Sequence, residues 1–201
     1  MPVSINGQTG VITGLAVGGL PDGTVDADTL ASNAVTAGKL ASGVGGKVLQ
    51  YKITKKNDGA STSSTATAGV EISSDFRITL TPISATSIIY CQANLSATVV
   101  STATSNYKIY RNTASDFSGT STLIMPPSNN STNVDGNMNF YDDSGGFMGG
   151  FTVTAFETAG NTTARTYSPF WATQTNYIYL NKWSSAYYYS TSTFSVLEVA
   201  A

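Results

Sequence analysis

The chain has 201 residues, of which 41% are hydrophobic and only 11% are charged, so its surface polarity must come from uncharged side chains such as Ser, Thr, Asn and Gly. Ten basic and twelve acidic side chains give a net charge of −2, and no basic cluster could neutralise a row of phosphates, which argues against nucleic-acid binding. The absence of histidine excludes His-based triads and His-containing zinc sites.

Residues 1–24 are rich in glycine and contain two short β-prone segments around Asn6-Gly7, a strong turn signal. A hairpin of this size is not stable alone, so we expect the segment to dock onto another protein. The sequence shows neither a secretory signal nor a run of about 18 apolar residues. We therefore expect that the chain folds in the cytoplasm of the producing cell and does not insert into a membrane. The apolar docking candidates are Val3, Ile5, Val11 and Ile12.

Residues 25–44 contain an internal repeat, VDADTLASNA followed directly by VTAGKLASGV. Its large apolar residues recur every five positions, which fits neither the helical period of about 3.6 nor the strand period of about 2. A series of single helical turns, with Asp26 and Thr36 as capping residues, accounts for the spacing. The apolar positions are Val25, Leu30, Val35 and Leu40.

A stack of single turns has no second layer within its own chain, so several chains must share the apolar core. Threefold symmetry suits such a stack, because it brings one Leu or Val from each chain to the same level. The repeat therefore predicts a trimeric shaft over residues 25–46. The alternative is a flexible Ala/Ser/Gly linker, although linkers rarely place Leu at a regular spacing.

Residues 47–201 have the composition of a β domain, with Ser and Thr alternating with Val, Ile, Tyr and Phe between turn clusters such as Asn57-Asp58-Gly59. Short strands at such intervals predict an antiparallel β-sandwich or jelly roll. We expect the last strand to lie in the middle of a sheet, with Phe194, Val196 and Val199 set among Thr193, Ser195 and Glu198. The expected strands cover residues 48–55, 70–80, 87–100, 107–111, 122–125, 138–141, 151–156, 165–172, 177–182 and 187–199.

The chain offers little for metal or cofactor chemistry. Cys91 lies in an apolar run and is expected to be a small buried hydrophobic residue. Asp135, Asp142 and Asp143 lie in Gly/Asn-rich stretches, where solvated turn aspartates are favoured over a calcium site. We expect no cofactor and no metal, and we expect the loops at 126–136 and 142–150 to form exposed tips.

Aromatic residues are dense in the last third of the chain. Such side chains stack on sugar rings or fill protein interfaces, and the alternative for each is packing in the core. The candidate receptor or interface aromatics are Tyr167, Trp171, Trp183, Tyr187 and Tyr188.

Several of these segments resemble phage virion proteins. The opening SINGQTG at residues 4–10 looks like the start of many marine-phage tail-fibre proteins, and residues 25–44 resemble the Asp-Ala-x-x-Leu-Ala and Val-Thr-x-x-Lys-Leu-Ala repeats of their shafts. ITLTP followed by ATSII, over residues 78–89, is similar to an Ile-Thr-Pro and Ala-Thr-Ser-Lys-Ile pattern that opens a β domain in such proteins, although Leu80 and Ile88 depart from it. The closing VLEV looks like the last strand of that domain.

The resemblance implies a virion anchor, a trimeric shaft and a terminal knob similar to the tumour-necrosis-factor type of jelly roll. The expected function is that of a homotrimeric virion fibre protein, held by its N-terminus to other phage tail or capsid proteins and contributing to attachment to a host-surface glycan or protein. The alternative is a capsid or tail decoration protein with no receptor role. A glycan-cleaving enzyme is disfavoured, because it needs paired carboxylates in a cleft.

Overall fold

The computed structural model of the protein is mainly β and divides into two compact units, Met1–Gly46 and Lys47–Ala201. In the first unit β1 (Ser4–Asn6) pairs antiparallel with β2 (Val11–Thr13), as the turn signal at Asn6-Gly7 predicts. The structure describes residues 4–6, 8, 11–13, 35, 47–66, 68–99, 104–124, 138–141, 147–174, 176–182 and 190–201.

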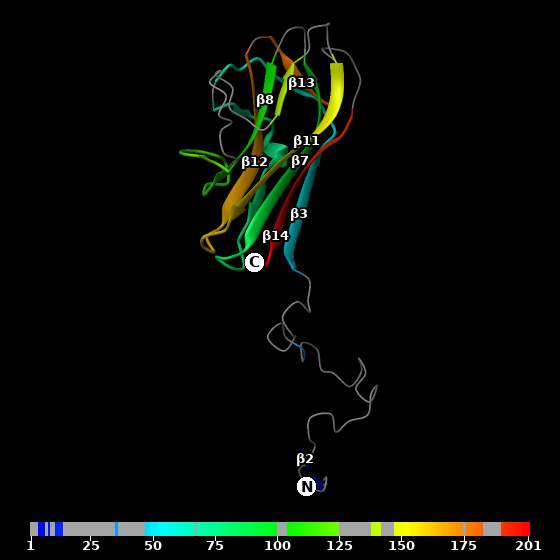
Figure 1. The fold of residues 1–201 in the computed structure, drawn as a ribbon, viewed down its shortest axis with the longest axis vertical. Helices are drawn as coiled ribbons and strands as arrows, with labels where there is room; N and C mark the ends of the chain where they lie inside the picture. The colour runs from blue at the N-terminus through cyan, green and yellow to red at the C-terminus, as the bar shows by residue number, and fades with distance from the viewer. Residues whose placement is uncertain are drawn as a thin grey trace. The chain divides into compact units, whose positions relative to one another are not determined.

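One sheet of the second unit is built around β7 (Ile88–Val99), and we call it the β7 sheet. Strand β11 (Phe147–Thr158) pairs with the full length of β7 along one edge. The other edge of β7 is shared end to end by β14 (Ser192–Val199) and β13 (Ile178–Leu180). The sheet is completed by β3 (Val48–Lys56), paired with β14, and β4 (Ala60–Thr62), paired with β13. The last strand thus lies between β3 and β7, as predicted (Figure 1).

The second sheet is built in the same way around β12 (Arg165–Thr173), and we call it the β12 sheet. Strand β8 (Thr104–Asn112) runs along one edge of β12, while β6 (Ile78–Leu80) and β5 (Val70–Glu71) share the other. The far side of β8 pairs with β10 (Met138–Tyr141) and β9 (Thr122–Leu123). All of these pairs are antiparallel.

The two sheets pack face to face around one hydrophobic core (Figure 1). Strand alternation explains which side chains enter it, because every second residue of a strand points to the same face. On β7 the inward positions hold mainly small residues, which leaves room for large aromatic side chains from the β12 sheet. The buried residues of β7 are Ile89, Cys91, Ala93, Leu95 and Ala97, and the facing aromatics are Tyr107, Tyr167 and Trp171.

Proline in the middle of a central strand normally removes a ladder hydrogen bond. Pro169 lies near the middle of β12, and its carbonyl accepts a hydrogen bond from the N–H of Ile72 at 3.0 Å. Because the N and O of one strand residue point to the same side, its nitrogen also faces the edge shared by β5 and β6. Strand β5 ends at Glu71 and β6 begins at Ile78, so the missing N–H meets the gap between them.

The single strand predicted over residues 70–80 is wrong. The segment folds as β5, the 3-10 helix η2 (Ser74–Phe76) and β6. Ser73 caps the turn, because its hydroxyl accepts a hydrogen bond from the N–H of Asp75 at 3.2 Å. Phe76 is thereby turned into the core, where it is fully buried. The hydrogen bond to the Ser73 hydroxyl thus favours a turn at this point over a continuous strand.

Two further boundaries differ from the prediction. Strand β11 begins at Phe147, so the loop predicted over residues 142–150 ends before that residue, and Gly149 and Gly150 are paired with β7. Pairing with the long neighbouring strand overrides the low strand propensity of glycine. Strand β4, which the prediction omits, is a three-residue strand that needs β13 as its partner.

Glu198 lies on the inner face of β14 with Phe194 and Val196, whereas the prediction set it among the polar positions and Val199 among the apolar ones. Its carboxylate is fully buried and accepts hydrogen bonds from the Gln50 amide at 2.6 Å and from the N–H of Ile83 at 2.7 Å. The buried carboxylate thus fastens the turn before β7 to the end of β14.

Candidate functional site

Two of the predicted surface aromatics lie inside the molecule. Tyr167 and Trp171 are on the inner face of β12, with 0% and 2% of their surface exposed. This burial corrects their assignment as candidate receptor or interface aromatics, because they pack in the core. The other three candidates, Trp183, Tyr187 and Tyr188, lie outside the described residues.

The predicted shaft and docking residues fall in the first unit. Val35 lies in a bend and is 50% exposed, while Val25, Leu30 and Leu40 lie outside the described residues. Ile5 lies in β1 opposite Ile12 of β2, and Val11 pairs with Asn6. Val3 lies outside the described residues.

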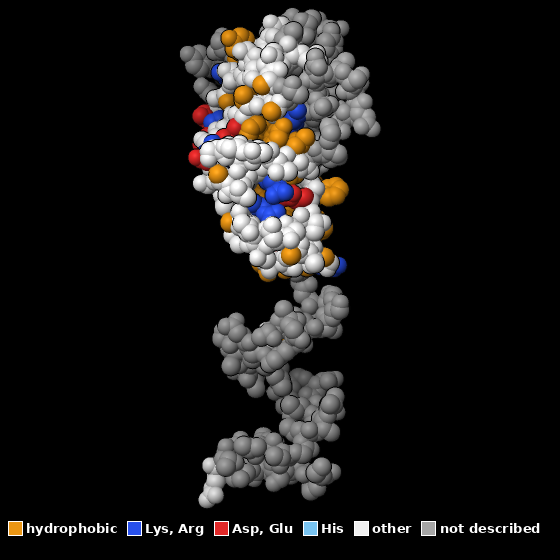
Figure 2. All heavy atoms as spheres, turned by 90° about the vertical axis from the view of Figure 1, so that its left-hand side faces the viewer, with side chains coloured by type: hydrophobic (Ala, Val, Ile, Leu, Met, Phe, Trp, Pro, Cys, Tyr) orange, Lys and Arg blue, Asp and Glu red, His pale blue; other side chains and the backbone are white. Residues whose placement is uncertain are grey.

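The structure describes no concentrated charged site. Asp135, Asp142 and Asp143, and the loop at 126–136, lie outside the described residues. Within the part of the chain that is described, no group of three or more His, Cys, Asp or Glu side chains could hold a metal ion. On the face drawn in Figure 2, acidic and basic side chains gather in small mixed groups on a mostly uncharged surface. In the described segments no helix is both long and apolar enough for a membrane span.

The outer face of the β7 sheet carries a row of large apolar side chains. Tyr51, Leu197, Tyr90 and Phe156 are successive cross-strand partners on β3, β14, β7 and β11. Cross-strand partners point to the same face of a sheet, and the neighbours of Tyr90 along β7 point into the core. The row therefore faces outward, and Tyr51 and Phe156 are 58% and 71% exposed.

The neighbouring positions extend this row. Val199 pairs with Val48 on one side and with Ile88 on the other, and Ile53 lies two residues beyond Tyr51 on β3. Val48 and Ile53 are 54% and 55% exposed. We call the whole set the outer apolar patch: Val48, Tyr51, Ile53, Ile88, Tyr90, Phe156, Leu197 and Val199.

Farther along the same face the side chains become polar. Asn94 accepts hydrogen bonds at Oδ1 from Thr152 at 2.7 Å and from Gln92 at 3.2 Å, and its Nδ2 lies 3.4 Å from the Thr193 hydroxyl. A shallow pocket of about 270 Å³ follows beside Gly150. The outer face of the β7 sheet is therefore divided into an apolar part and a polar part.

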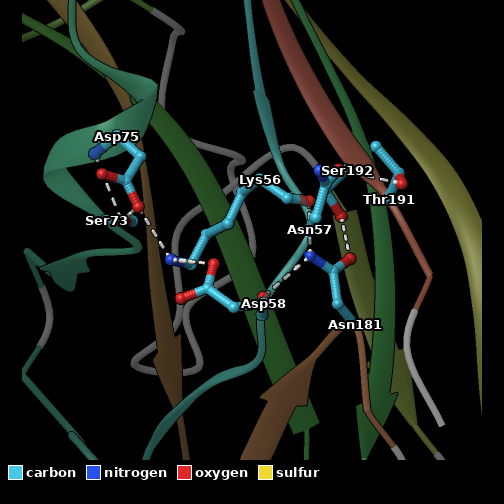
Figure 3. A network of polar contacts seen from close by, with 8 residues as sticks. All are labelled: Lys56, Asn57, Asp58, Ser73, Asp75, Asn181, Thr191 and Ser192. Carbon is cyan, nitrogen blue, oxygen red and sulfur yellow. Dashed lines mark hydrogen bonds and ion pairs between the residues drawn. The ribbon is translucent and has the colours of Figure 1, made fainter.

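A buried asparagine fixes the junction of β3, β13 and β14 (Figure 3). Asn181 donates from Nδ2 to the carbonyls of Lys56 at 2.8 Å and Asp58 at 3.1 Å, and its Oδ1 accepts from the Ser192 hydroxyl at 2.6 Å. Its backbone N–H donates to the carbonyl of Ser96 at 2.8 Å. Its φ of 56° is a conformation that Asn adopts more readily than most residues.

Lys56 extends the junction toward η2 (Figure 3). Its ammonium lies 2.7 Å from Asp58 and 2.8 Å from Asp75, and its side chain is only 6% exposed. Burial alone lowers the pKa of Lys56, but the hydrogen bonds and charges of the two aspartates outweigh burial and raise it. The lysine therefore stays charged and links the end of β3 to η2, which is a structural role.

A second ionic group joins the ends of β8, β11 and β12. Glu157 accepts a hydrogen bond from the Tyr167 hydroxyl at 2.8 Å, and its carboxylate lies 2.9 Å from Arg111 and 3.6 Å from the buried Arg165. Burial, followed by the charge of Glu157, raises the pKa of Tyr167 well above its usual range. Both carboxylate oxygens are engaged in these contacts, so Glu157 links the ends of the three strands.

No known family model matches the chain, and no curated protein matches its sequence. The ionisable groups Lys56, Glu157 and Glu198 hold strands together, whereas no contact within the described part of the chain gives the outer apolar patch a structural role.

The outer apolar patch is the surface feature that sequence reasoning missed. Tyr51 and Ile53 alternate with Lys52 and Thr54, which is the signal of a strand with one apolar face. An apolar strand face usually packs into a core, but the register with β14 places Tyr51 and Ile53 on the outer face of the β7 sheet.

Proposed function

We propose that this protein is a structural fibre subunit of a bacteriophage particle, acts as a homotrimer and has no enzymatic role. Its N-terminal residues attach to other phage tail or capsid proteins, and its β domain projects outward and contributes to attachment to a glycan or protein on the host surface. The observation that carries the proposal is the order of parts: a small hairpin, a repeat of period five, and a separately folded β unit.

The strand order of the β unit supports a jelly roll of the tumour-necrosis-factor type. One sheet contains β3, β14, β7 and β11 in succession, and the other contains β6, β12, β8 and β10. Each sheet thus interleaves strands from the two halves of the domain, as two nested Greek keys require. The short strands β4, β5, β9 and β13 extend this pattern at its edges.

The trimeric shaft is supported by the apolar repeat. Val35 is half exposed in the single chain, and it belongs to the set with Val25, Leu30 and Leu40 at a spacing of five. Apolar side chains at regular intervals along a thin segment gain burial when several copies share a core. Three copies around one axis supply that core.

Electron microscopy of the phage particle tests the proposal. Particles would be labelled with an antibody raised against the β unit, and the expected result is label at the ends of projecting fibres. Label spread over the capsid shell would contradict the fibre assignment and would favour a decoration protein. Particles without label would contradict a virion role altogether.

A further inference from the structure

The outer apolar patch differs from ordinary scattered surface hydrophobics. Single exposed apolar residues are common on soluble proteins and need no explanation. Here Tyr51, Leu197, Tyr90 and Phe156 are joined across four strands, on the face that a two-sheet fold normally leaves polar. The polar part of the same face, around Asn94 and Thr152, follows the normal rule. We therefore expect another surface to cover the apolar part.

The position of the patch along the chain identifies that partner. Strand β3, which carries Tyr51 and Ile53, begins at Val48, four residues after the repeat ends at Val44. Four residues span at most about 14 Å. If three repeats share a core, the three β3 strands must start close together, and a second copy is present at very high effective concentration.

The chemistry of the patch fits a copy of the same chain. Its register neighbours Gln92, Thr154, Thr158 and Ser195 are uncharged, whereas Lys55, two residues beyond Ile53 on β3, lies at the border with the polar part, in register with Thr193 and Asn94. Three identical surfaces around one axis would repeat any charge three times and repel one another. An anionic membrane or a nucleic acid would instead select basic side chains.

We infer that the outer apolar patch is a contact between subunits within the β domain, so that the trimer is held at the shaft and again at the β7 sheet. This inference rests on the proposed homotrimer. Tyr51 and Phe156, largely exposed in the single chain, lose their contact with water in the assembly.

Hydroxyl-radical footprinting of the full-length protein tests this contact. Oxidation rates of Tyr51, Tyr90 and Phe156 would be measured by mass spectrometry and compared with those of the unfolded chain, alongside the mass in solution from light scattering. The single chain, with Phe156 71% exposed, would react nearly as fast as the unfolded chain. The inferred contact slows Tyr51 and Phe156 several-fold.

A pair of double variants supplies an independent readout. Tyr51→Glu with Phe156→Glu places two charges in the patch, and Thr122→Glu with Thr163→Glu places two charges on exposed positions outside it. The first pair should make the trimer dissociate at much higher protein concentration than the second pair does.

The outcomes separate this inference from the proposed function. A wild-type trimer in which Tyr51 and Phe156 react like the unfolded chain, or in which both double variants dissociate alike, overturns the patch contact and leaves the trimer standing. A wild-type monomer at micromolar concentration overturns the proposed homotrimer, and the inference with it.

Discussion

Asn181 shows how much of this fold depends on single buried polar side chains. The β7 sheet needs two short strands along one edge of β7, and a gap in the backbone ladder opens where β13 ends and β14 has not begun. Asn181 and Ser192 fill that gap: the Ser96 N–H donates to the Ser192 hydroxyl at 3.0 Å, and the Ser96 carbonyl accepts from the Asn181 N–H. A buried network of this kind is favourable only when every member is satisfied.

Replacing Asn181 by Ala should therefore destabilise the protein strongly. The change leaves the carbonyls of Lys56 and Asp58 without their donor and the Ser192 hydroxyl without its acceptor. We expect the free energy of unfolding, measured in urea, to fall by about 3 kcal/mol. Asn176→Ala is the matched control, because Asn176 also has a positive φ of 59° but is exposed. An equal loss in both variants would contradict the role of the network.

Glu198 gives the fold a dependence on pH. Burial alone raises the pKa of Glu198, but the nearby Ser87 hydroxyl and the donors from Ile83, Ser84 and Gln50 outweigh burial and lower it below the ordinary 4.5. A carboxyl group with a lowered folded pKa stabilises the protein above its unfolded pKa, and this contribution is lost as the pH falls through the folded value.

The variant Glu198→Gln should reveal this contribution. At pH 7 it should be less stable than the wild type by about 2 kcal/mol, because a charge-assisted acceptor is lost. The gap should narrow as the pH is lowered through and below the ordinary carboxyl range, where the wild-type carboxylate takes up its proton. Urea unfolding at several pH values measures the gap, and a gap independent of pH would contradict the assigned role of the charge.

At the scale of elements, strand positions that follow from the alternation of apolar and polar residues could be predicted from the sequence. Features that depend on contacts between residues distant in the sequence could not. The last strand was placed correctly in the middle of a sheet, because Phe194 and Val196 alternate with polar residues. The inward side of Glu198 was missed, because its donors Gln50 and Ile83 are distant in the sequence. The break between β5 and β6 follows from the local cap at Ser73, a signal that was present but outweighed by the surrounding apolar residues.

The candidate surface shows the same division. The period-five repeat could be recognised from the sequence, because its apolar spacing is local. The outer apolar patch could not, since Tyr51, Leu197, Tyr90 and Phe156 become neighbours only through the pairing of four strands. Tyr167 and Trp171 were candidates for the surface because aromatic composition does not distinguish the inner face of a strand from the outer one.

The repeat itself can be tested separately from the β unit. Leu30→Asp together with Leu40→Asp places charges where the three chains are proposed to meet. The trimer should weaken, while the β unit, a compact unit of its own from Lys47 onward, should keep its circular dichroism spectrum. The matched control changes Ser32 and Ser42, two polar repeat positions, to Asp. Equal weakening by both pairs would contradict a core built on the leucines.

At the scale of the whole molecule, each of the two compact units exposes large apolar side chains in the single chain. Val35 is half exposed in the first unit, and the outer apolar patch is exposed in the second. Association of three copies would cover both surfaces with the same symmetry. The oligomeric state therefore decides whether both surfaces are buried.

The most direct measurement is the mass of the full-length protein in solution. Size-exclusion chromatography with light scattering at micromolar concentration should give about three times the chain mass of 20.9 kDa. A single species at the mass of one chain would contradict the proposed fibre subunit.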